Sequence, residues 1–155
     1  MTSARHGEVT LHMNAAPERV WEVLADVERM GEWSPECYRV RWLDGAGSPA
    51  TVGARFKGSN RWRWMRWSMT CQITTADPGR ELSWATIRGG RPIVRWTYRL
   101  QPANGGTEVT ESFEALRWPL DVRVAEDFIM RGRDEQRAQA MRTTLQRIKA
   151  AAESA

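Results

Sequence analysis

The N-terminal part of the chain changes from a strand period to a helical period. Apolar residues occupy every second position of residues 9–13, which is the pattern of a half-buried β-strand. From Pro17, which suits the first turn of a helix, apolar residues recur at helical spacing through Asp26. Gly31 and Pro35 then limit the next segment to a short second helix or a turn. This part therefore predicts one strand followed by two short helices.

The middle of the chain predicts six further strands, separated by turn sequences rich in glycine, proline and asparagine. The predicted strands are Cys37–Asp44, Gly53–Asn60, Arg66–Thr75, Glu81–Ile87, Ile93–Gln101 and Thr107–Leu116. No connection between them is long enough to hold a crossover helix. We therefore expect an antiparallel meander.

After Pro119 the hydrophobic period becomes helical again and predicts one long helix from about Arg131 to Glu153. Its apolar face carries Ala138, Met141, Leu145, Ile148 and Ala152, and the opposite face is charged. At about 1.5 Å per residue this helix would be about 34 Å long. A sheet of seven strands would be about 29 Å wide. The pattern predicts an α+β fold, with a curved seven-stranded antiparallel sheet around the C-terminal helix in one domain over residues 1–155.

Composition excludes several classes of protein. Hydrophobic residues make up 41% of the chain and charged residues 27%, which is a globular composition, and no apolar run is long enough to cross a bilayer. Residues 1–7 precede no apolar segment of a secretory signal, so we expect a cytoplasmic location. Cys37 and Cys71 show no CxxC spacing, and we expect neither a disulfide framework nor a metal site.

The formal net charge of +4 raises the question of an anionic partner. Arginine accounts for almost all of the basic residues and is spread along the chain, as in proteins of GC-rich bacterial genomes. This spread argues against both nucleic acid and a membrane surface as the partner. The one dense basic cluster is the segment 61–67, in which three arginines alternate with three tryptophans.

Several short motifs resemble the START/polyketide cyclase (SRPBCC) superfamily, in its bacterial polyketide cyclase/dehydrase and lipid-transport branch. They are Pro17-Glu-Arg-Val-Trp21 with Leu24-Ala-Asp26, Gly31-Glu-Trp33-Ser34-Pro35, Val52-Gly-Ala-Arg-Phe56 with Gly58-x-Asn60, Asp77-Pro-Gly79, and Gly106-Thr-Glu-Val-Thr-Glu-Ser112. The resemblance covers almost the whole chain and implies a helix-grip fold with a cavity between sheet and helix. It does not imply one activity, because the superfamily includes cyclases, hydrolases and lipid carriers.

Strand alternation and the helix period place one set of residues toward the interior. The candidate ligand-binding residues are Phe56, Asn60, Trp67, Met69, Trp84, Trp96, Tyr98, Glu111, Phe113 and Met141. The polar members Asn60, Tyr98 and Glu111 would orient a ligand in an otherwise aromatic pocket. The alternatives are a solid core and, for Glu111, a structural pair with an inward arginine or a tryptophan N–H.

Three functions follow from this pattern. The first is binding of a small hydrophobic molecule, aromatic or polyketide/lipid-like, with no cofactor. The second is a cyclase, aromatase or dehydratase in which Glu111 acts as acid or base and Tyr98 or Asn60 stabilises an enolate-like oxygen. No histidine base or nucleophile set accompanies Glu111. The third is an interaction module that uses the segment 61–67.

In that segment, alternation would put Trp62 and Trp64 on the inner side of the sheet, as a lid over the pocket mouth. A homodimer contact and binding to a membrane surface or nucleic acid are the alternatives. Near the start of the long helix, Asp127, Arg131 and Asp134 could reach the pocket mouth, although a solvated charged face is the preferred interpretation.

Overall fold

A computed structural model describes residues 5–43, 45, 50–125 and 132–154. The strands in these ranges form one seven-stranded sheet in the order β1-β7-β6-β5-β4-β3-β2, and every neighbouring pair is antiparallel. Their bounds are β1 His6–Met13, β2 Cys37–Trp42, β3 Arg55–Trp62, β4 Met65–Asp77, β5 Glu81–Arg88, β6 Arg91–Ala103 and β7 Gly106–Ala115. The predicted meander is confirmed.

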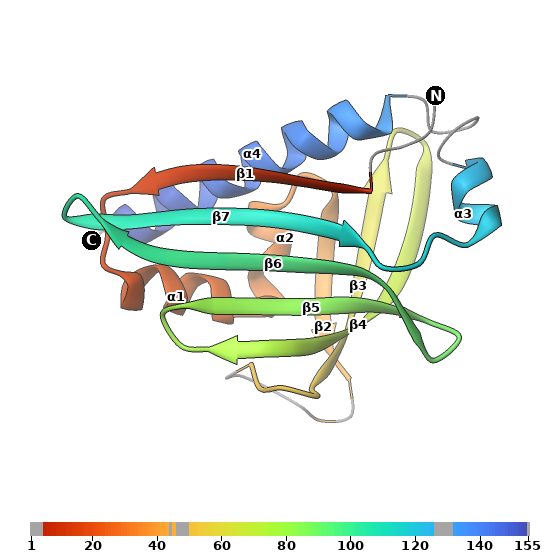
Figure 1. The fold of residues 1–155 in the computed structure, drawn as a ribbon, viewed down its shortest axis with the longest axis horizontal. Helices are drawn as coiled ribbons and strands as arrows, with labels where there is room; N and C mark the ends of the chain where they lie inside the picture. The colour runs from red at the N-terminus through yellow and green to blue at the C-terminus, as the bar shows by residue number, and fades with distance from the viewer. Residues whose placement is uncertain (1–4, 44, 46–49, 126–131, 155) are drawn as a thin grey trace.

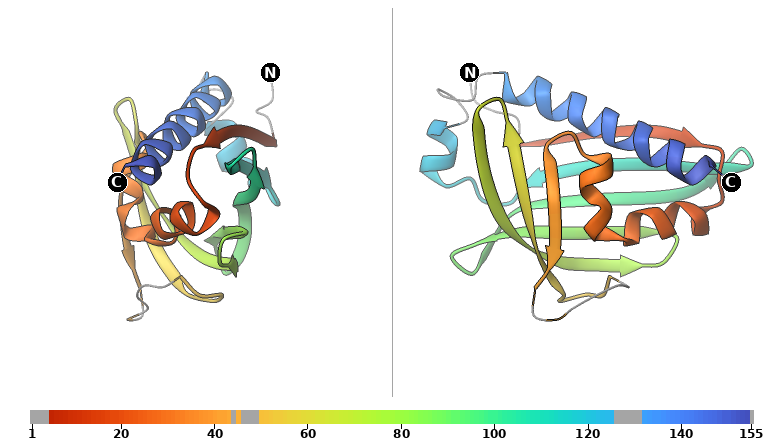
Figure 2. Two further views of the ribbon diagram at one scale, coloured as in Figure 1. Left: turned by 90° about the vertical axis from the view of Figure 1, so that its left-hand side faces the viewer. Right: turned by 180° about the vertical axis from the view of Figure 1, so that it is seen from behind.

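The helices lie on the concave side of this curved sheet, except the short helix after β7, which lies beyond the end of that strand (Figures 1 and 2). Their bounds are α1 Pro17–Ala25, the 3₁₀ turn η1 Val27–Arg29, α2 Met30–Trp33, α3 Leu120–Val124 and α4 Arg133–Glu153. The long helix α4 runs along the sheet beside β1, and α1 and α2 close one side (Figure 2). The expected α+β helix-grip fold is confirmed, while α3 was not predicted. None of the described helices is long and apolar enough to cross a membrane.

The close contact between α2 and β2 depends on a residue of the second resemblance motif. A Cβ atom on Gly31 would lie 2.5 Å from the backbone oxygen of Tyr38, a distance that side-chain carbons do not reach. Glycine therefore lets α2 pack directly on the adjoining strand. The turn between them is held by Ser34, whose Oγ accepts the backbone N–H groups of Glu36 and Cys37 at 3.2 and 2.9 Å.

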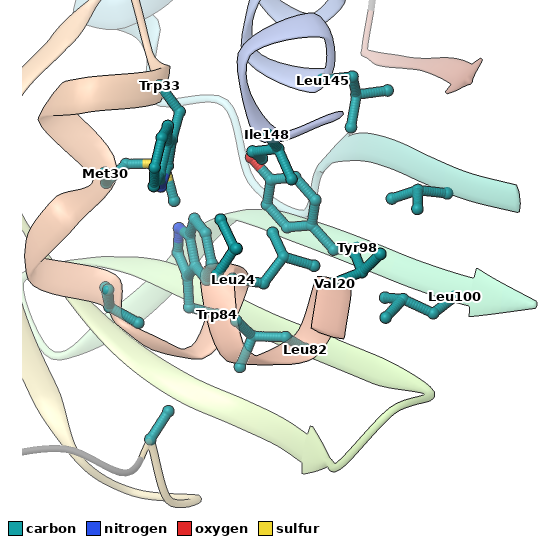
Figure 3. Packing of buried hydrophobic residues seen from close by; sticks show 14 of the residues in the cluster. Val20, Leu24, Met30, Trp33, Leu82, Trp84, Tyr98, Leu100, Leu145 and Ile148 are labelled. Atoms are coloured by element: carbon teal, nitrogen blue, oxygen red, sulfur yellow. The ribbon is translucent and has the colours of Figure 1, made fainter. Parts of the chain in front are cut away.

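The hydrophobic core lies between the C-terminal half of α4, helix α1 and the sheet (Figure 3). Leu145 and Ile148 of α4 are fully buried, and Met141 is buried with them, as their spacing predicts. Helix α1 contributes Val20 and Leu24. The sheet contributes Leu82, Leu100 and Val109. These contacts fix α4 on the sheet.

Replacing Leu145 by alanine would remove a fully buried side chain from this contact. We expect the free energy of unfolding to fall by about 2–5 kcal/mol, because the transfer free energy is lost and a cavity is left. Urea unfolding would measure the change. The control is Gln146→Ala at the adjacent exposed position, for which we expect a change within about 0.5 kcal/mol. Similar losses for the two variants would contradict this packing.

Candidate functional site

A cavity of about 470 Å³ lies in the fold. Single elements contribute to both the core and the cavity wall. In β6, Leu100 belongs to the core and Trp96 lines the cavity. In α4, Leu145 belongs to the core and Ala140 lines the cavity. The core therefore occupies one end of the space under α4, and the cavity occupies the end nearer the start of that helix.

The structure brings every predicted ligand-binding residue to this cavity. Its lining includes Phe56, Asn60, Trp67, Met69, Trp84, Trp96, Tyr98, Glu111, Phe113 and Met141. Strand alternation was sufficient to find most of them, because the strands keep a regular pleat where they face α4. The solid-core alternative is wrong for this end of the molecule. That these side chains bind a ligand stays a prediction.

Aromatic rings form much of the cavity wall. Phe56 of β3 contacts Trp84 of β5 edge to face, with the ring centroids 5.5 Å apart. Trp84 in turn lies 5.6 Å from Tyr98 of β6 (Figure 3). Trp96 lies 5.4 Å from Phe113, its partner on β7. Such a wall is apolar and polarisable, and it matches a ligand that is itself aromatic or unsaturated.

The most unusual polar group in this wall is Glu111. Its side chain is buried, and its Oε1 accepts a hydrogen bond from the Tyr98 hydroxyl at 2.5 Å. The two residues are directly paired across β6 and β7. Burial raises the pKa of Glu111 from 4.5 to about 8, against the lowering effect of the Tyr98 hydrogen bond. At neutral pH most molecules therefore hold a neutral carboxyl group, which can donate as well as accept a hydrogen bond.

The two cysteines line the cavity as neutral thiols. Burial is the main cause of their shifts and raises the pKa of Cys37 to about 11 and that of Cys71 to about 12. Cys71 also contacts the hydroxyl of Thr86, with 3.8 Å between the sulfur and oxygen atoms. Because the thiolate is the nucleophilic form, neither cysteine is activated for covalent chemistry at neutral pH.

A buried ion pair connects α4 to the turn before β2. The Arg133 guanidinium binds both carboxylate oxygens of Glu36, with 2.7 Å between Nη1 and Oε2. Gln136 contacts both members of the pair. The guanidinium carbon of Arg133 also lies 5.5 Å from the ring centroid of Trp67 and 5.8 Å from that of Trp62. The start of α4 is thus held over the cavity by charge and ring contacts.

Arginines on the cavity side of α4 are the main feature that the sequence analysis missed. It considered only Asp127, Arg131 and Asp134 near the start of this helix and preferred a solvated face for them, and it did not name Arg133 and Arg137, which are only 7% and 6% exposed. The Arg137 guanidinium carbon lies 4.6 Å from the ring centroid of Phe113, and its Nη1 donates to Asp134 at 3.4 Å. Asp127 and Arg131, which were predicted near the same region, lie outside the described residues.

These arginines do follow a helical period that could have been noticed. The helix lines the cavity with Arg133, Arg137, Ala140 and Thr144, which recur every three or four positions, and with Met141 next to Ala140. The apolar stripe was easier to detect, and Glu36 is far away in the sequence. The lining also includes Trp118, Pro119, Val122 and Ala125, from a segment for which no helix was predicted.

The segment 61–67 differs from its prediction at its tip. Trp62 pairs with Met65, so Arg63 and Trp64 form a two-residue turn outside the ladder of hydrogen bonds. Alternation does not apply there, and Trp64 is 80% exposed. The prediction that both tryptophans face inward is therefore wrong for Trp64. Trp62 is half-buried beside Arg133.

The site offers binding contacts and one neutral carboxyl group. Among the described residues, no group of three or more His, Cys, Asp or Glu side chains is arranged to hold a metal ion. The potential hydrogen-bonding groups for a ligand include Asn60, Glu111 and the indole N–H of Trp118. The indole N–H is buried and has no hydrogen-bond partner in the described part of the chain.

Comparison with known proteins agrees with this geometry. A family model described as "Polyketide cyclase / dehydrase and lipid transport" matches residues 4–153. A polyketide-cyclase-like protein from Corynebacterium glutamicum is 29% identical, with a TM-score of 0.59, and the match covers 99% of this chain and 91% of that protein.

More distant structures share the fold. A protein from Chromobacterium violaceum is 16% identical, with a TM-score of 0.71, and the match covers 98% of this chain and all of that one. A protein from Mycobacterium smegmatis is 15% identical, with a TM-score of 0.64 and coverage of 94% and 89%. No curated protein sequence matches the chain.

The raised pKa of Glu111 makes stability depend on pH in a defined direction. Between about pH 5 and pH 8 the folded protein holds a proton that the unfolded chain releases. The contribution of Glu111 is complete below its unfolded pKa and is lost as the pH rises through about 8. We expect the free energy of unfolding to fall by up to about 1.4 kcal/mol per pH unit in this range.

Glu111→Gln keeps an acceptor for Tyr98 but removes the titration, so its unfolding free energy should decline less over the same range. Urea unfolding of both proteins across this pH range would test the expectation, since all other groups titrate in both. Parallel profiles would show that Glu111 is ionised in the folded protein.

Proposed function

The chain belongs to the polyketide cyclase/dehydrase and lipid transport family, and from this membership and the cavity we propose that it binds a small, largely apolar molecule between the sheet and α4. The family fold supports a ligand-binding or cyclase-like role. The single observation that carries the proposal is the aromatic cavity of about 470 Å³. This volume is in the ordinary range of small-molecule sites.

The physical argument concerns the side chains around the cavity. Trp96 and Phe113 face space in which they lack the neighbours that a close-packed core provides, so dispersion contacts are missing there. An apolar ligand would restore those contacts and would be transferred out of water. The void, which lowers the stability of the free protein, therefore makes the free energy of binding more favourable.

The polar groups limit the chemistry of the ligand. Glu111 presents a neutral carboxyl group at physiological pH, and Trp118 presents an indole N–H without a partner among the described residues. Both groups can donate to an oxygen acceptor. A flat aromatic or polyketide-like body with one or two carbonyl or hydroxyl oxygens fits this combination. The free thiols of Cys37 and Cys71 suit the reducing cytoplasm, the location that we propose.

An uncharged aromatic dye can test this proposal without knowledge of the natural ligand. N-phenyl-1-naphthylamine should bind in the cavity, gain emission and quench tryptophan fluorescence. Ala140→Phe places a ring at a position that lines the cavity, so we expect the Kd of the dye to rise about tenfold or more.

The matched control is Ala138→Phe, two positions along α4, where alanine is partly exposed and does not line the cavity. It should leave the Kd of the dye unchanged, and circular dichroism would check that both variants are folded. Equal dye binding by the wild type and Ala140→Phe would reject this cavity as the binding site.

A second candidate function, a cyclase, aromatase or dehydratase, is favoured by one observation. The neutral Glu111 carboxyl group lies in the cavity wall, and its Oε1 accepts the hydrogen bond from Tyr98. The carboxyl proton can therefore be transferred to a ligand oxygen. Asn60, which also lines the cavity, is half-buried. It could contact an enolate-like oxygen.

Glu111→Gln separates binding from catalysis. With a short poly-β-ketone thioester as the test substrate, an enzyme should lose roughly 10²–10⁴-fold in rate on this substitution while its dye affinity is kept. Product formation would be followed by mass spectrometry. Glu114→Gln, on the exposed face of the same strand, is the control. If the wild type does not exceed the uncatalysed rate, the enzyme candidate fails and the binding proposal is unaffected.

A further inference from the structure

Exposed apolar side chains are concentrated at one end of the molecule. Trp64 lies at the turn between β3 and β4, and Leu120 and Val124 lie on α3, with exposures of 80%, 72% and 45%. Figures 1 and 2 show α3 and the β3–β4 turn at the same end in opposite views. Among the described residues, the other exposed large hydrophobic side chains are Val52, at 66% in the connection between β2 and β3, and Tyr38, at 39% in β2.

The turn presents Trp64 to solvent, with 80% of the residue exposed. Arg63 has a φ of 56°, in the left-handed region that residues with a side chain seldom adopt. Its guanidinium carbon lies 4.4 Å from the ring centroid of Trp62. Trp62 is thus covered on one face, whereas Trp64 projects from the tip. A large exposed ring on a strained two-residue turn is a feature that folding alone does not require.

Uncompensated positive charge surrounds this tryptophan. Arg61 and Arg66 are directly opposite each other in the β3–β4 ladder, where like charges are destabilising. Both guanidinium groups stack on Tyr38, with 5.3 and 5.7 Å between the guanidinium carbons and the ring centroid. Within the described part of the chain, neither they nor Arg63 form a salt bridge. An external anionic surface would relieve this repulsion.

Helix α3 contributes the second half of the surface. Leu120 and Val124 are four residues apart and share one exposed face of this helix. Asp121 forms an ion pair with Arg88, which ties the helix to the end of β5. Val122 lines the cavity, so α3 separates the cavity from the exposed apolar face.

The cavity reaches the surface at this same end. Arg66 and Arg117 line it and are themselves exposed, whereas Trp84 and Tyr98 at its other limit are buried. The exposed tryptophan, the basic cluster and α3 therefore lie around the opening of the cavity. A molecule that leaves the cavity would emerge between them.

We propose that this end of the molecule docks on a lipid bilayer that contains anionic lipids. Trp64, Leu120 and Val124 enter the interface, where the amphipathic indole ring is favourable. Arg61 and Arg63 bind lipid phosphates, to which guanidinium groups are well matched. Docking in this way does not depend on which molecule occupies the cavity. It would place the opening of the cavity against the apolar region of the bilayer.

Two other partners fit these observations less well. A nucleic acid would use the tryptophan and the arginines, but the aliphatic side chains of Leu120 and Val124 offer no face on which bases can stack. A symmetric dimer through the hairpin would bring the arginines of two copies together, and their like charges would repel each other. The combination of exposed aliphatic and aromatic side chains with arginine favours a lipid surface.

Vesicle co-sedimentation of the full chain tests the proposal. We expect binding to vesicles of phosphatidylcholine and phosphatidylglycerol in equal amounts, weakened by salt, and little binding to phosphatidylcholine alone. Removing two surface guanidinium groups with Arg61→Gln and Arg63→Gln should weaken binding roughly 30-fold, at about 1 kcal/mol for each charge. Trp64→Ala should weaken it about tenfold.

Matched controls remove the same groups elsewhere. Arg41→Gln with Arg80→Gln lowers the net charge equally, and both of these side chains are exposed and do not line the cavity. Arg80 belongs to the β4–β5 turn, which lies at the end of the molecule opposite α3 (Figure 1). Val52→Ala shortens another exposed apolar side chain. Both controls should bind vesicles within about twofold of the wild type, because surface attraction declines within a Debye length.

Three results would overturn the proposal. One is equal binding to the two kinds of vesicle, and another is an equal loss in the control and hairpin variants. The third is a Trp64→Ala variant that binds vesicles as well as the wild type but has lost another interaction of the wild type. That interaction would be binding to a single-stranded oligonucleotide, or dimerisation in the absence of lipid. Dye binding to the cavity, measured in the same variants, should persist throughout, so failure of docking is distinguishable from failure of ligand binding.

Discussion

The ion pair between Arg133 and Glu36 is the contact on which the cavity depends. The C-terminal half of α4 is held to the sheet by buried apolar residues such as Leu145 and Ile148. The N-terminal half faces the cavity, so close apolar packing cannot hold it there. A guanidinium bound to both oxygens of Glu36 and placed beside Trp67 holds it instead. Buried ion pairs contribute little net stability once desolvation is counted, and their value here is to fix position.

The same low-dielectric surroundings determine the chemistry of the opposite wall. Tyr98 belongs to the hydrophobic core (Figure 3) and also lines the cavity. Its hydroxyl donates a hydrogen bond to Glu111. Because no cation binds Glu111 among the contacts of the described residues, its carboxyl group stays neutral at physiological pH. The two glutamates of the site thus have different partners. Glu36 binds the Arg133 guanidinium, whereas Glu111 meets only the Tyr98 hydroxyl among the contacts of the described residues, and burial raises its pKa.

The fold and part of the candidate site could be predicted from the sequence, and the physics of each element explains which part. Alternation placed Phe56, Trp84 and Glu111 correctly, since a pleated ladder fixes the direction of each side chain. It failed for Trp64 because a two-residue turn is outside the ladder. Arg133 was not among the predicted site residues, because charged residues on a helix are usually solvated and its partner lies 97 positions away. The cavity volume depends on how far the sheet curves from α4, which no residue pattern encodes.

The division of single elements between core and cavity has a consequence for how this protein can change. On β6, Leu100 packs in the core while Trp96, four residues away, faces the cavity; on α4, Leu145 and Ala140 divide in the same way. Substitutions at cavity positions such as Trp96 and Ala140, which belong neither to the core cluster nor to the Arg133–Glu36 pair, alter shape and polarity without removing the contacts that fix α4. New ligand preferences can therefore accumulate through neutral drift on an unchanged framework. One architecture can in this way diversify into many binding specificities while the conditions for folding are inherited intact.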